Sequence, residues 1–310
     1  MNLIGLKEQT REDLIGYLNA AEEFLTPDGG VHTPASYREI LNGRHLGLVF
    51  LEPSTRTRVS FEMAARRLGA NTMLVTEEAT SLKKGESSLD TCLNLAAMGF
   101  DALVVRHTDR QLPYVLAERL GIPIINAGNG SGEHPTQGLL DALTLRRHFR
   151  AGEDLAGLRV AIVGDIVHSR VARSNTYCLN TLGAHVTLAG PPTLVPTPAD
   201  GWPARIVSSR PEALADADAV IVLRIQRERM HLPFVGEEGY VQDWGIDEAV
   251  MRDEMRPDAV IMHPGPVIRG IELTDAVIDH PRSLILRQVT HGVAIRQAIL
   301  ANLCRRASSE

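Results

Sequence analysis

The chain has 310 residues, 44% of them hydrophobic and 23% charged, with a formal net charge of −6. This length predicts one large domain or two domains of ordinary size, and the negative charge argues against a general attraction to nucleic acid or an anionic membrane. No segment approaches the ~18 uninterrupted apolar residues of a membrane span, and the first residues lack the order of a signal peptide. We therefore expect a cytoplasmic protein.

The first predicted element is a helix within residues 9–26. Leu14, Leu18 and Ala21 recur there at helical spacing behind Thr10. Beyond it, short apolar runs alternate with helical segments in both halves of the chain, which predicts parallel sheets with helices on both faces. The expected strands are residues 48–51, 72–75, 102–105 and 122–125, then 158–163, 185–189, 219–223 and 259–262.

Two helical segments bear on the domain organisation. Residues 139–149 read as a connector between two domains, and residues 293–305 as a final helix that could cross back to the first domain. We predict an α/β fold of two doubly wound parallel-sheet domains facing a shared cleft. The first domain would span residues 1–148, with the C-terminal helix 290–310 packing on it, and the second residues 149–289. Residues 190–203 are rich in proline and predict a surface loop.

The stretch from 48 to 69 predicts a strand that passes directly into a helix. The helix is indicated by Val59, Met63, Ala64 and Leu68 on one face and by Gly69 as a stop. Ser54, Thr55, Arg56 and Thr57 then fall at the helix N-terminus, where backbone N–H groups and the helix dipole favour an anion. Hydroxyl and guanidinium groups added to these N–H groups suit a phosphate. The alternative is an ordinary cap with solvated arginines.

The other unusual polar residues also follow predicted strands. In open parallel sheets ligands bind outside the carboxyl ends of the strands, so all of these motifs fall on the binding edge. Arg106 closes a buried strand, where a structural ion pair is the alternative, and His134 and Gln137 lie one turn apart at a helix start. The motifs are Arg106 with His107, residues 126–137, residues 165–173, residues 224–229 and residues 263–269.

Three further features complete the predicted site. Alternation along the strand end puts Arg224 and Gln226 on one side, as a fork for a carboxylate. The turn at Pro264 and Gly265 would present backbone carbonyls, with a cis bond before Pro266 as one option. The polar loop at residues 80–91 is either a solvated surface or a source of lysines that reach an anion in a neighbouring site.

Several common motifs of cofactor, nucleotide and metal sites are absent from the sequence. There is no GxGxxG after a strand, no Walker motif, no HExxH and no GxSxG, and the eleven histidines show no metal spacing. Cys92, Cys178 and Cys304 lie far apart without disulfide or zinc spacing, and we expect small core residues. The prediction is a metal-free, cofactor-free site rich in arginine, which binds a phosphate and a carboxylate together.

Taken together, these motifs resemble the aspartate/ornithine carbamoyltransferase family over nearly the whole chain. STRTR and HPTQ are common to the family, whereas GDIVHSRVARS and LRIQRER resemble its aspartate branch, and the SMG loop and HCLP motif of the ornithine branch are absent. The matching segments, in the family's order, are FLEPSTRTRVSFE, SLKKGES, VVRH, HPTQGLLD, GDIVHSRVARS, LRIQRER and HPGPVIRG.

The resemblance implies a role for each matching residue. Ser54, Thr55, Arg56, Thr57 and Arg106 match the carbamoyl phosphate site. Thr55, Arg106 and His134 match the groups around the carbamoyl oxygen, and Gln137 with the carbonyls of Pro264 and Gly265 match those that hold its amide. The carboxylates of L-aspartate would be held by Arg170, Arg224, Gln226 and Lys84, while Ser81 and Lys84 match residues lent by an adjacent subunit.

The implied reaction is attack of the aspartate amine on the carbamoyl carbon, with Thr55, Arg106, His134 and Lys84 as catalytic groups and with phosphate leaving. The implied assembly is a homotrimer or a multiple of trimers with shared sites, in pyrimidine biosynthesis. A regulatory chain or a dihydroorotase partner stays open, as does Thr80 in place of Ser81. Ile268 departs from the asparagine common in the family, and we expect only a local loop change.

Three alternatives have distinct signatures. A carbamoyltransferase for a cationic acceptor such as ornithine would want a carboxylate or polar loop where this chain has Arg224. A non-catalytic binding protein would have lost Arg106, His134 or Lys84, and all three are present. A dinucleotide enzyme would need the missing glycine fingerprint.

Overall fold

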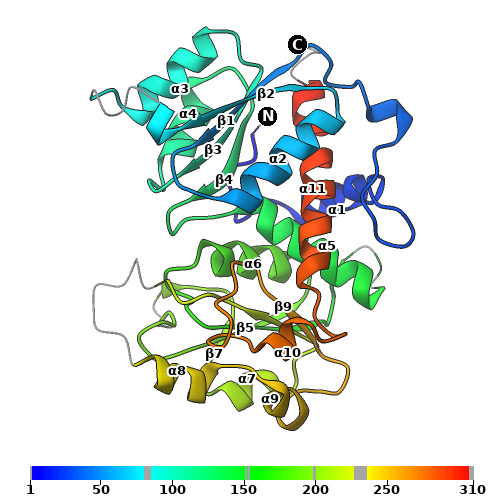
Figure 1. Cartoon of the computed structure of the whole chain (residues 1–310), viewed down its shortest axis with the longest axis vertical. Helices are drawn as coiled ribbons and strands as arrows, with labels where there is room; N and C mark the ends of the chain where they lie inside the picture. Colours follow the sequence, from blue (N-terminus) through cyan, green and yellow to red (C-terminus); the bar gives the residue numbers. More distant parts are fainter. Residues whose placement is uncertain are drawn as a thin grey trace. The chain divides into compact units, whose positions relative to one another are not determined.

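The structure is a computed structural model that describes residues 2–79, 85–150, 152, 154–197, 200–226 and 236–306. It divides into two compact units (Figure 1), Met1–Leu140 with Val289–Glu310, and Asp141–Gln288. Both divisions fall inside helices, α5 (Pro135–Phe149) and α11 (Ile285–Arg306). Within the described ranges, no helix combines the length and apolar character that a membrane crossing requires.

The first unit is built on a parallel sheet with strand order β2-β1-β3-β4. Its strands are β1 (His45–Phe50), β2 (Asn71–Thr76), β3 (Ala102–His107) and β4 (Ile124–Asn129). Each predicted strand of this half is present, with bounds shifted by at most four residues. The helical elements are α1 (Arg11–Glu22), η1 (Ala35–Tyr37), α2 (Thr55–Arg67), η2 (Glu77–Ala79), α3 (Ser88–Ala97), α4 (Leu112–Arg119) and the start of α5.

The second unit is built on a parallel sheet with strand order β7-β6-β5-β8-β9. Its strands are β5 (Arg159–Val163), β6 (His185–Ala189), β7 (Arg205–Val207), β8 (Ala219–Val222) and β9 (Val260–Met262). The edge strand β7 was not predicted, because three residues are too short to show a pattern. The helices are α6 (Arg170–Thr181), α7 (Arg210–Leu214), α8 (Glu237–Trp244), α9 (Glu248–Asp253) and α10 (Asp275–Ile278).

Each sheet has one point where the strand order reverses. In the first sheet the chain runs outward from β1 to β2 and then returns to β3 on the other side. In the second it runs outward from β5 through β6 to β7 and returns to β8. Helices that leave neighbouring strands in opposite directions open a crevice at such a point, so ligands bind there. The β1/β3 and β5/β8 junctions are therefore the expected binding positions of the two units.

Helix α2 forms where it was predicted, but only part of its predicted face is buried. Glu62 pairs with Arg66 at 2.7 Å, and Gly69 ends the helix with φ of +87°, a conformation that favours glycine. Phe61 and Ala65 are buried, whereas Val59 and Met63 are 42% and 43% exposed. The face predicted from Val59, Met63, Ala64 and Leu68 is therefore only partly buried, because two apolar stripes run along this helix and one of them packs on the sheet.

The C-terminal helix α11 packs on the first unit, as predicted. Within that unit, the Arg296 guanidinium lies 5.0 Å from the ring of Phe61 on α2, and its Nη2 donates to Thr136 Oγ1 at 3.1 Å. Gln297 Nε2 donates to Thr33 Oγ1 at 2.7 Å. Figure 1 shows α11 beside α2. The contact between Arg296 and Phe61 joins α11 to the helix that begins with the STRTR motif.

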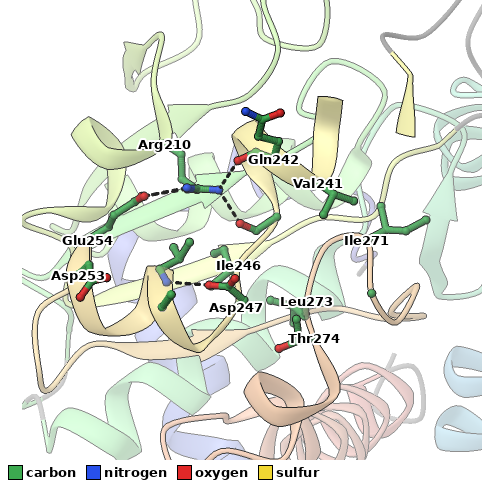
Figure 2. A pocket seen from close by; sticks show the side chains of 14 residues that line it. Arg210, Val241, Gln242, Ile246, Asp247, Asp253, Glu254, Ile271, Leu273 and Thr274 are labelled. Atoms are coloured by element: carbon green, nitrogen blue, oxygen red, sulfur yellow. Dashed lines mark hydrogen bonds and ion pairs between the residues drawn. The ribbon is translucent and has the colours of Figure 1, made fainter. Parts of the chain in front are cut away.

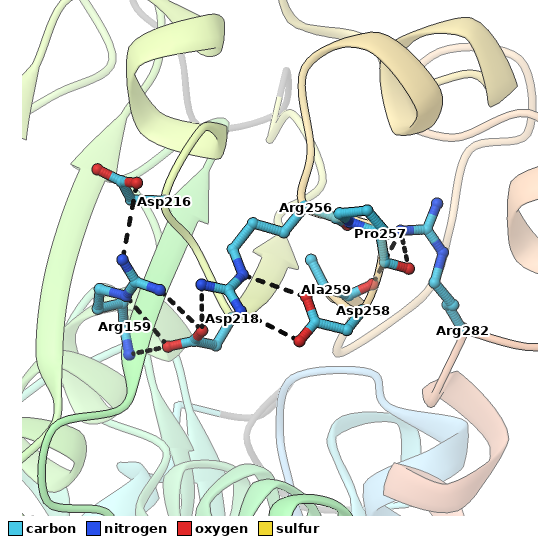
Figure 3. Close-up of polar contacts among 8 residues, drawn as sticks. All are labelled: Arg159, Asp216, Asp218, Arg256, Pro257, Asp258, Ala259 and Arg282. Atoms are coloured by element: carbon cyan, nitrogen blue, oxygen red, sulfur yellow. Dashed lines mark hydrogen bonds and ion pairs between the residues drawn. The ribbon is translucent and has the colours of Figure 1, made fainter.

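The amino ends of β5, β8 and β9 carry an ion network (Figure 3). Asp218 accepts from the backbone N–H of Arg159 at 2.8 Å and from its guanidinium at 3.1 Å. Arg256 bridges the carboxylates of Asp218 and Asp258. Arg282 donates to the carbonyls of Arg256, Pro257 and Ala259. The network ties the chain segments that enter the sheet to one another.

The remaining sequence expectations concern the interior. Cys92, Cys178 and Cys304 are buried, as expected of core residues. The sheet strands β5, β8 and β9 contribute apolar side chains to a core that also includes Tyr240 and Trp244 of α8. Burial raises the pKa of the Cys92 and Cys304 thiols to about 12, so both stay protonated near neutral pH.

Candidate functional site

At the β1/β3 junction, Arg106, the last residue but one of β3, pairs with Phe50, the last residue of β1. Its side chain is buried, with Nη1 donating to the Ala127 carbonyl at 3.1 Å and Nη2 to Glu52 Oε1 at 3.0 Å. A buried guanidinium needs such partners, because desolvation of an unpaired charge is costly. Arg106 is thus held at the strand end by a carboxylate and by the neighbouring β4 segment.

The N-terminus of α2 lies at the same junction. Ser54 is the N-cap residue, in extended conformation, and within the described residues its side chain makes no capping hydrogen bond. The ordinary-cap interpretation requires that bond. Thr55 and Arg56 are exposed, while Thr57 is buried with its Oγ1 3.4 Å from His134 Nε2. The STRTR and HPTQ motifs, 77 residues apart, therefore meet at this helix end.

The HPTQ motif begins α5 with Pro135 as the first helical residue, a position that proline favours because it lacks an N–H. The His134 carbonyl accepts from Gln137 N at 2.9 Å, and both side chains are buried. His134 and Gln137 therefore have fixed backbone positions beside α2.

His107 next to Arg106 is fixed as a structural link. Its Nδ1 accepts from the backbone N–H of Asp109 at 2.8 Å, so in the neutral ring the proton is on Nε2, which lies 3.0 Å from Ser88 Oγ. Burial lowers the pKa of His107 and favours this neutral form. The link joins β3 to the start of α3. The predicted residues Thr80, Ser81 and Lys84, which precede α3 in the sequence, lie outside the described residues.

At the β5/β8 junction the central group is Asp165, which is fully buried. Its Oδ2 accepts from the backbone N–H of Gln226 at 3.1 Å, and its Oδ1 lies 2.8 Å from His168 Nδ1. Gln226 Nε2 donates in turn to the His168 carbonyl at 3.1 Å. One carboxylate thereby joins the segments that follow β5 and β8.

The side chains predicted to bind carboxylates come from the same two segments, which follow β5 and β8. Arg170 is the first residue of α6, behind the capping residue Ser169, whose Oγ accepts from Ala172 N at 3.2 Å. Along residues 223–226, burial alternates. Leu223 and Ile225 are buried, and Arg224 and Gln226 are partly exposed. The alternation predicted for this strand end is confirmed by the burial.

A second buried carboxylate, Glu272, holds the same segment from the other side. It accepts from Ile225 N at 3.2 Å and from Ile268 N at 2.7 Å. Burial raises its pKa, and the two backbone bonds and the nearby charge of Arg224 oppose that rise. The Ile268 side chain packs against the apolar core, so the residue that departs from the family pattern is accommodated by apolar neighbours.

The HPGP turn follows β9 and contains a cis bond between Gly265 and Pro266. Gly265 N donates to His263 Nδ1 at 2.8 Å, and His263 N donates to Gln288 Oε1 at 2.9 Å. Gln288 then binds Asp141 of α5 at 2.7 Å. This chain of bonds fixes the turn that carries Pro264 and Gly265.

Away from these junctions, the second unit has a pocket of about 330 Å³ between α8 and α9 (Figure 2). Arg210 on its wall donates to Glu254 and to the carbonyls of Gln242 and Gly245. Among the described residues, those that line this pocket include none of the predicted site residues. Over the same described ranges, no group of three or more His, Cys, Asp or Glu side chains is arranged to hold a metal ion.

Sequence reasoning assigned no role to the carboxylates that hold the predicted residues. Glu52 lies inside the LEPSTRT motif, and Asp165 begins the 165–173 motif two residues after β5, so their positions near strand ends were readable signals. No sequence pattern pointed to Glu272. It binds the backbone N–H groups of Ile225 and Ile268, and such bonds do not depend on the identity of the partner side chains.

Residues 1–147 match the family model described as aspartate/ornithine carbamoyltransferase, carbamoyl-P binding domain, and residues 156–303 match its Asp/Orn binding domain. The aspartate carbamoyltransferase catalytic subunit of Streptomyces griseus is 46% identical over 96% of this chain and 92% of its own length.

Solved structures agree. The catalytic subunit of M. jannaschii aspartate transcarbamoylase is 30% identical, with a TM-score of 0.82 over 100% of this chain and 99% of its own. Aspartate transcarbamoylase from Trypanosoma cruzi, in complex with carbamoyl phosphate and aspartate, is 28% identical, with a TM-score of 0.82 over 97% of this chain and 95% of its own.

Proposed function

The chain belongs to the aspartate/ornithine carbamoyltransferase family, and on that premise we propose that it transfers the carbamoyl group of carbamoyl phosphate to L-aspartate. The products are N-carbamoyl-L-aspartate and phosphate. The observation that carries the proposal is the position of the motifs. The phosphate-type residues gather at the β1/β3 junction and the carboxylate-type residues at the β5/β8 junction, where each sheet has its expected binding position.

The first domain takes carbamoyl phosphate. In the predicted division this domain spans residues 1–148 together with the C-terminal helix. The N–H groups at the start of α2, the hydroxyls of Ser54, Thr55 and Thr57, and the Arg56 guanidinium bind the phosphate, with Arg106 beside them. The uncapped N-terminus of α2 supports this assignment, since its N–H groups and dipole attract an anion. Gln137 and the carbonyls of Pro264 and Gly265 hold the carbamoyl amide.

The second domain, which spans residues 149–289 in the predicted division, takes aspartate. Arg170, Arg224 and Gln226 bind its carboxylates, and Lys84 adds a further cation. Support comes from Asp165 and Glu272, which fix the backbone around Gln226 and Ile225 and so limit the loss of freedom on binding.

In the reaction, the α-amino group of aspartate attacks the carbamoyl carbon as a free amine. The C–N bond forms, a tetrahedral oxyanion develops on the carbamoyl oxygen, and the C–O bond to phosphate then breaks. Thr55, Arg106 and His134 donate to the oxyanion, each correctly aimed donor being worth about 3 kcal/mol. The departing phosphate accepts the proton of the amine. No covalent enzyme intermediate is needed.

We propose that the active species is a homotrimer or a multiple of trimers, with Ser81 or Thr80 and Lys84 lent by the adjacent subunit. Exposed apolar side chains on the first unit support this assembly. Val59 and Met63 of α2 and Met73 and Leu74 of the edge strand β2 are all at least 39% exposed. Apolar surface of this kind is typical of a face that another copy of the chain covers.

The cellular setting is inferred from the same family membership. We infer a role in pyrimidine biosynthesis in the cytoplasm, with a regulatory chain or a dihydroorotase as candidate partners. The net charge of −6 supports the absence of nucleic acid and membrane surfaces among its partners.

The deciding experiment measures carbamoyl transfer by the purified protein from carbamoyl phosphate to L-aspartate, with L-ornithine as parallel acceptor and no added metal. We expect turnover with aspartate alone. Arg56→Ala should lower kcat/KM on the order of 100-fold, because it removes a charged phosphate ligand. Arg66→Ala, on the same helix but paired to Glu62 and exposed, is the matched control and should retain full activity.

Other results would overturn the proposal. Turnover with ornithine would contradict the assignment of Arg224 and Gln226. Equal activity of the two arginine variants would contradict the phosphate site, and inactivity with both acceptors would favour a binding protein.

A further inference from the structure

Residues 2–7 lie along the β4 edge of the first sheet, with an isolated parallel bridge between Leu3 and Ile125. Leu3 N donates to the Ile124 carbonyl at 3.0 Å, and Asn126 N donates to the Leu3 carbonyl at 2.9 Å, as in a parallel pair with β4. Asn126 Nδ2 also donates to the Ile4 carbonyl at 2.7 Å. Leu3 and Leu6 are fully buried. This N-terminal segment (residues 2–7) is therefore a fixed part of the sheet edge.

The N-terminal segment ends on the carboxylate of Glu133. Glu133 Oε2 accepts from Leu6 N at 2.7 Å, and Oε1 accepts from Lys7 N at 3.4 Å. The side chain is only 5% exposed. A carboxylate is costly to bury unless N–H groups replace its water. A Cβ at Gly5 would lie 2.5 Å from Oε1, so the close approach of this carboxylate also requires glycine at position 5.

The main chain of Glu133 is held as firmly as its side chain. Its N–H donates to Asn129 Oδ1 at 2.7 Å, and its carbonyl accepts from Asn129 N at 3.2 Å and from Asn126 Nδ2 at 3.3 Å. The next residue is His134, whose Nε2 lies 3.4 Å from Thr57 Oγ1. A shift of Glu133 would be transmitted to His134 through one peptide unit.

We infer that Glu133 is a positioning residue, which uses the N-terminal segment to fix the backbone of His134. The inference rests on the proposed function, in which His134 donates to the carbamoyl oxygen. A carboxylate suits this place because two acceptor oxygens meet two N–H groups. Glutamine of the same shape has one acceptor oxygen, and its NH₂ would face an N–H.

The test compares Glu133→Gln with Glu118→Gln, a matched change at an exposed glutamate of α4. A displacement of about 1 Å in a catalytic group can cost on the order of 100-fold in rate, and we expect Glu133→Gln to lower kcat by roughly tenfold because it keeps one of the two bonds. The KM for aspartate should stay unchanged, since Arg170, Arg224 and Gln226, which bind its carboxylates, lie in the second unit. Glu118→Gln should behave as wild type.

Gly5→Ala supplies a second variant that leaves Glu133 itself intact. Its methyl group would displace the carboxylate and should lower kcat in the same direction. Equal kcat in wild type, Glu133→Gln and Gly5→Ala would overturn the inference. A fall in kcat that matches the fall in folded protein, measured by circular dichroism, would overturn it as well.

A readout without turnover separates this inference from the proposed function. We would record the imidazole signals of His134 by NMR with ¹⁵N-labelled histidine, assigned with His134→Asn. They should shift in Glu133→Gln and remain in place in Glu118→Gln. If they shift while wild type shows no carbamoyl transfer, the proposed function fails and the coupling stands. If they do not shift, the coupling fails whatever the activity.

Discussion

The two ends of the second sheet carry charged side chains that differ in burial and in hydrogen-bond partners. At the carboxyl ends of β5 and β8, Asp165 and Glu272 are fully buried and accept from backbone N–H groups. At the amino ends, Arg159, Arg256 and Asp258 are partly or largely exposed (Figure 3). Arg159 pairs with Asp216 and Asp218, and Arg256 pairs with Asp218 and Asp258. Only Asp218 there accepts from a described backbone N–H of a strand, that of Arg159.

The two ends differ in the groups that would lose a partner if a charged side chain were removed. Removal of a buried acceptor leaves buried N–H groups without a partner, and each such group costs about 1–3 kcal/mol. Removal of an exposed ion leaves groups that water can solvate, and salt screens the pair in any case. Both ends of the sheet are charged, but Asp165 and Glu272 at the carboxyl ends are fully buried. The buried carboxylates there fix the positions of loops, whereas the exposed ion pairs at the amino ends link strands.

The largest effect is expected for Asp165→Ala. It removes the acceptor for Gln226 N and for His168, so we expect a loss of activity on the order of 100-fold and a fall in the free energy of unfolding of about 2–4 kcal/mol. Steady-state kinetics and urea denaturation measure these quantities. Asp165→Asn, which keeps one acceptor oxygen, should fall between Asp165→Ala and wild type. A wild-type KM for aspartate in Asp165→Ala would contradict the assigned role.

An intermediate effect is expected from the pH dependence of Glu272. Burial raises its pKa above the ordinary value of 4.5, so the folded chain binds this proton more readily than the unfolded chain. Its contribution to the free energy of unfolding therefore increases as pH falls from neutral toward 4.5. We expect the stability of wild type relative to Glu272→Gln to rise over that window.

Urea denaturation at several pH values measures this difference. Glu238→Gln, at an exposed glutamate of α8, is the matched control. A difference between wild type and Glu272→Gln that stays constant with pH, or that rises toward neutral pH, would contradict the stated burial effect.

The smallest effect is expected for Arg256→Ala at the amino ends. It breaks the pairs with Asp258 and Asp218, both of which stay accessible to solvent. Activity should remain at the wild-type level, and any fall in the melting temperature should vanish in high salt. Scanning calorimetry at low and high salt measures this. A large, salt-independent fall would show that the two ends of the sheet are alike after all.

The order of strands and helices was readable because each element carries its own pattern. The runs at 102–105 and 185–189 became β3 and β6, and Thr10 caps α1 through its bond to Asp13 N. The failures have equally local causes. Strand β7 is too short for a pattern, and α2 offers two apolar stripes, of which periodicity cannot choose the one that packs.

The site residues also fall into those that the sequence predicted and those that it did not. Arg106, His134 and Arg224 were predicted from their place after strands, since topology sends every strand end of a parallel sheet to one edge. Their partners were not predicted. Glu52 holds Arg106, and Glu272 holds the backbone beside Arg224, through contacts that sequence spacing does not encode.

By itself the sequence determined the alternating α/β architecture, the edge on which the polar motifs fall, and the residue types suited to a phosphate and a carboxylate. These features depend on local periodicity and on the identity of side chains near one another in the chain. Only the tertiary structure decided which carboxylates became buried and which backbone N–H groups they hold. Those choices join residues as far apart as Leu6 and Glu133, and desolvation gives them their energy only after the chain has folded.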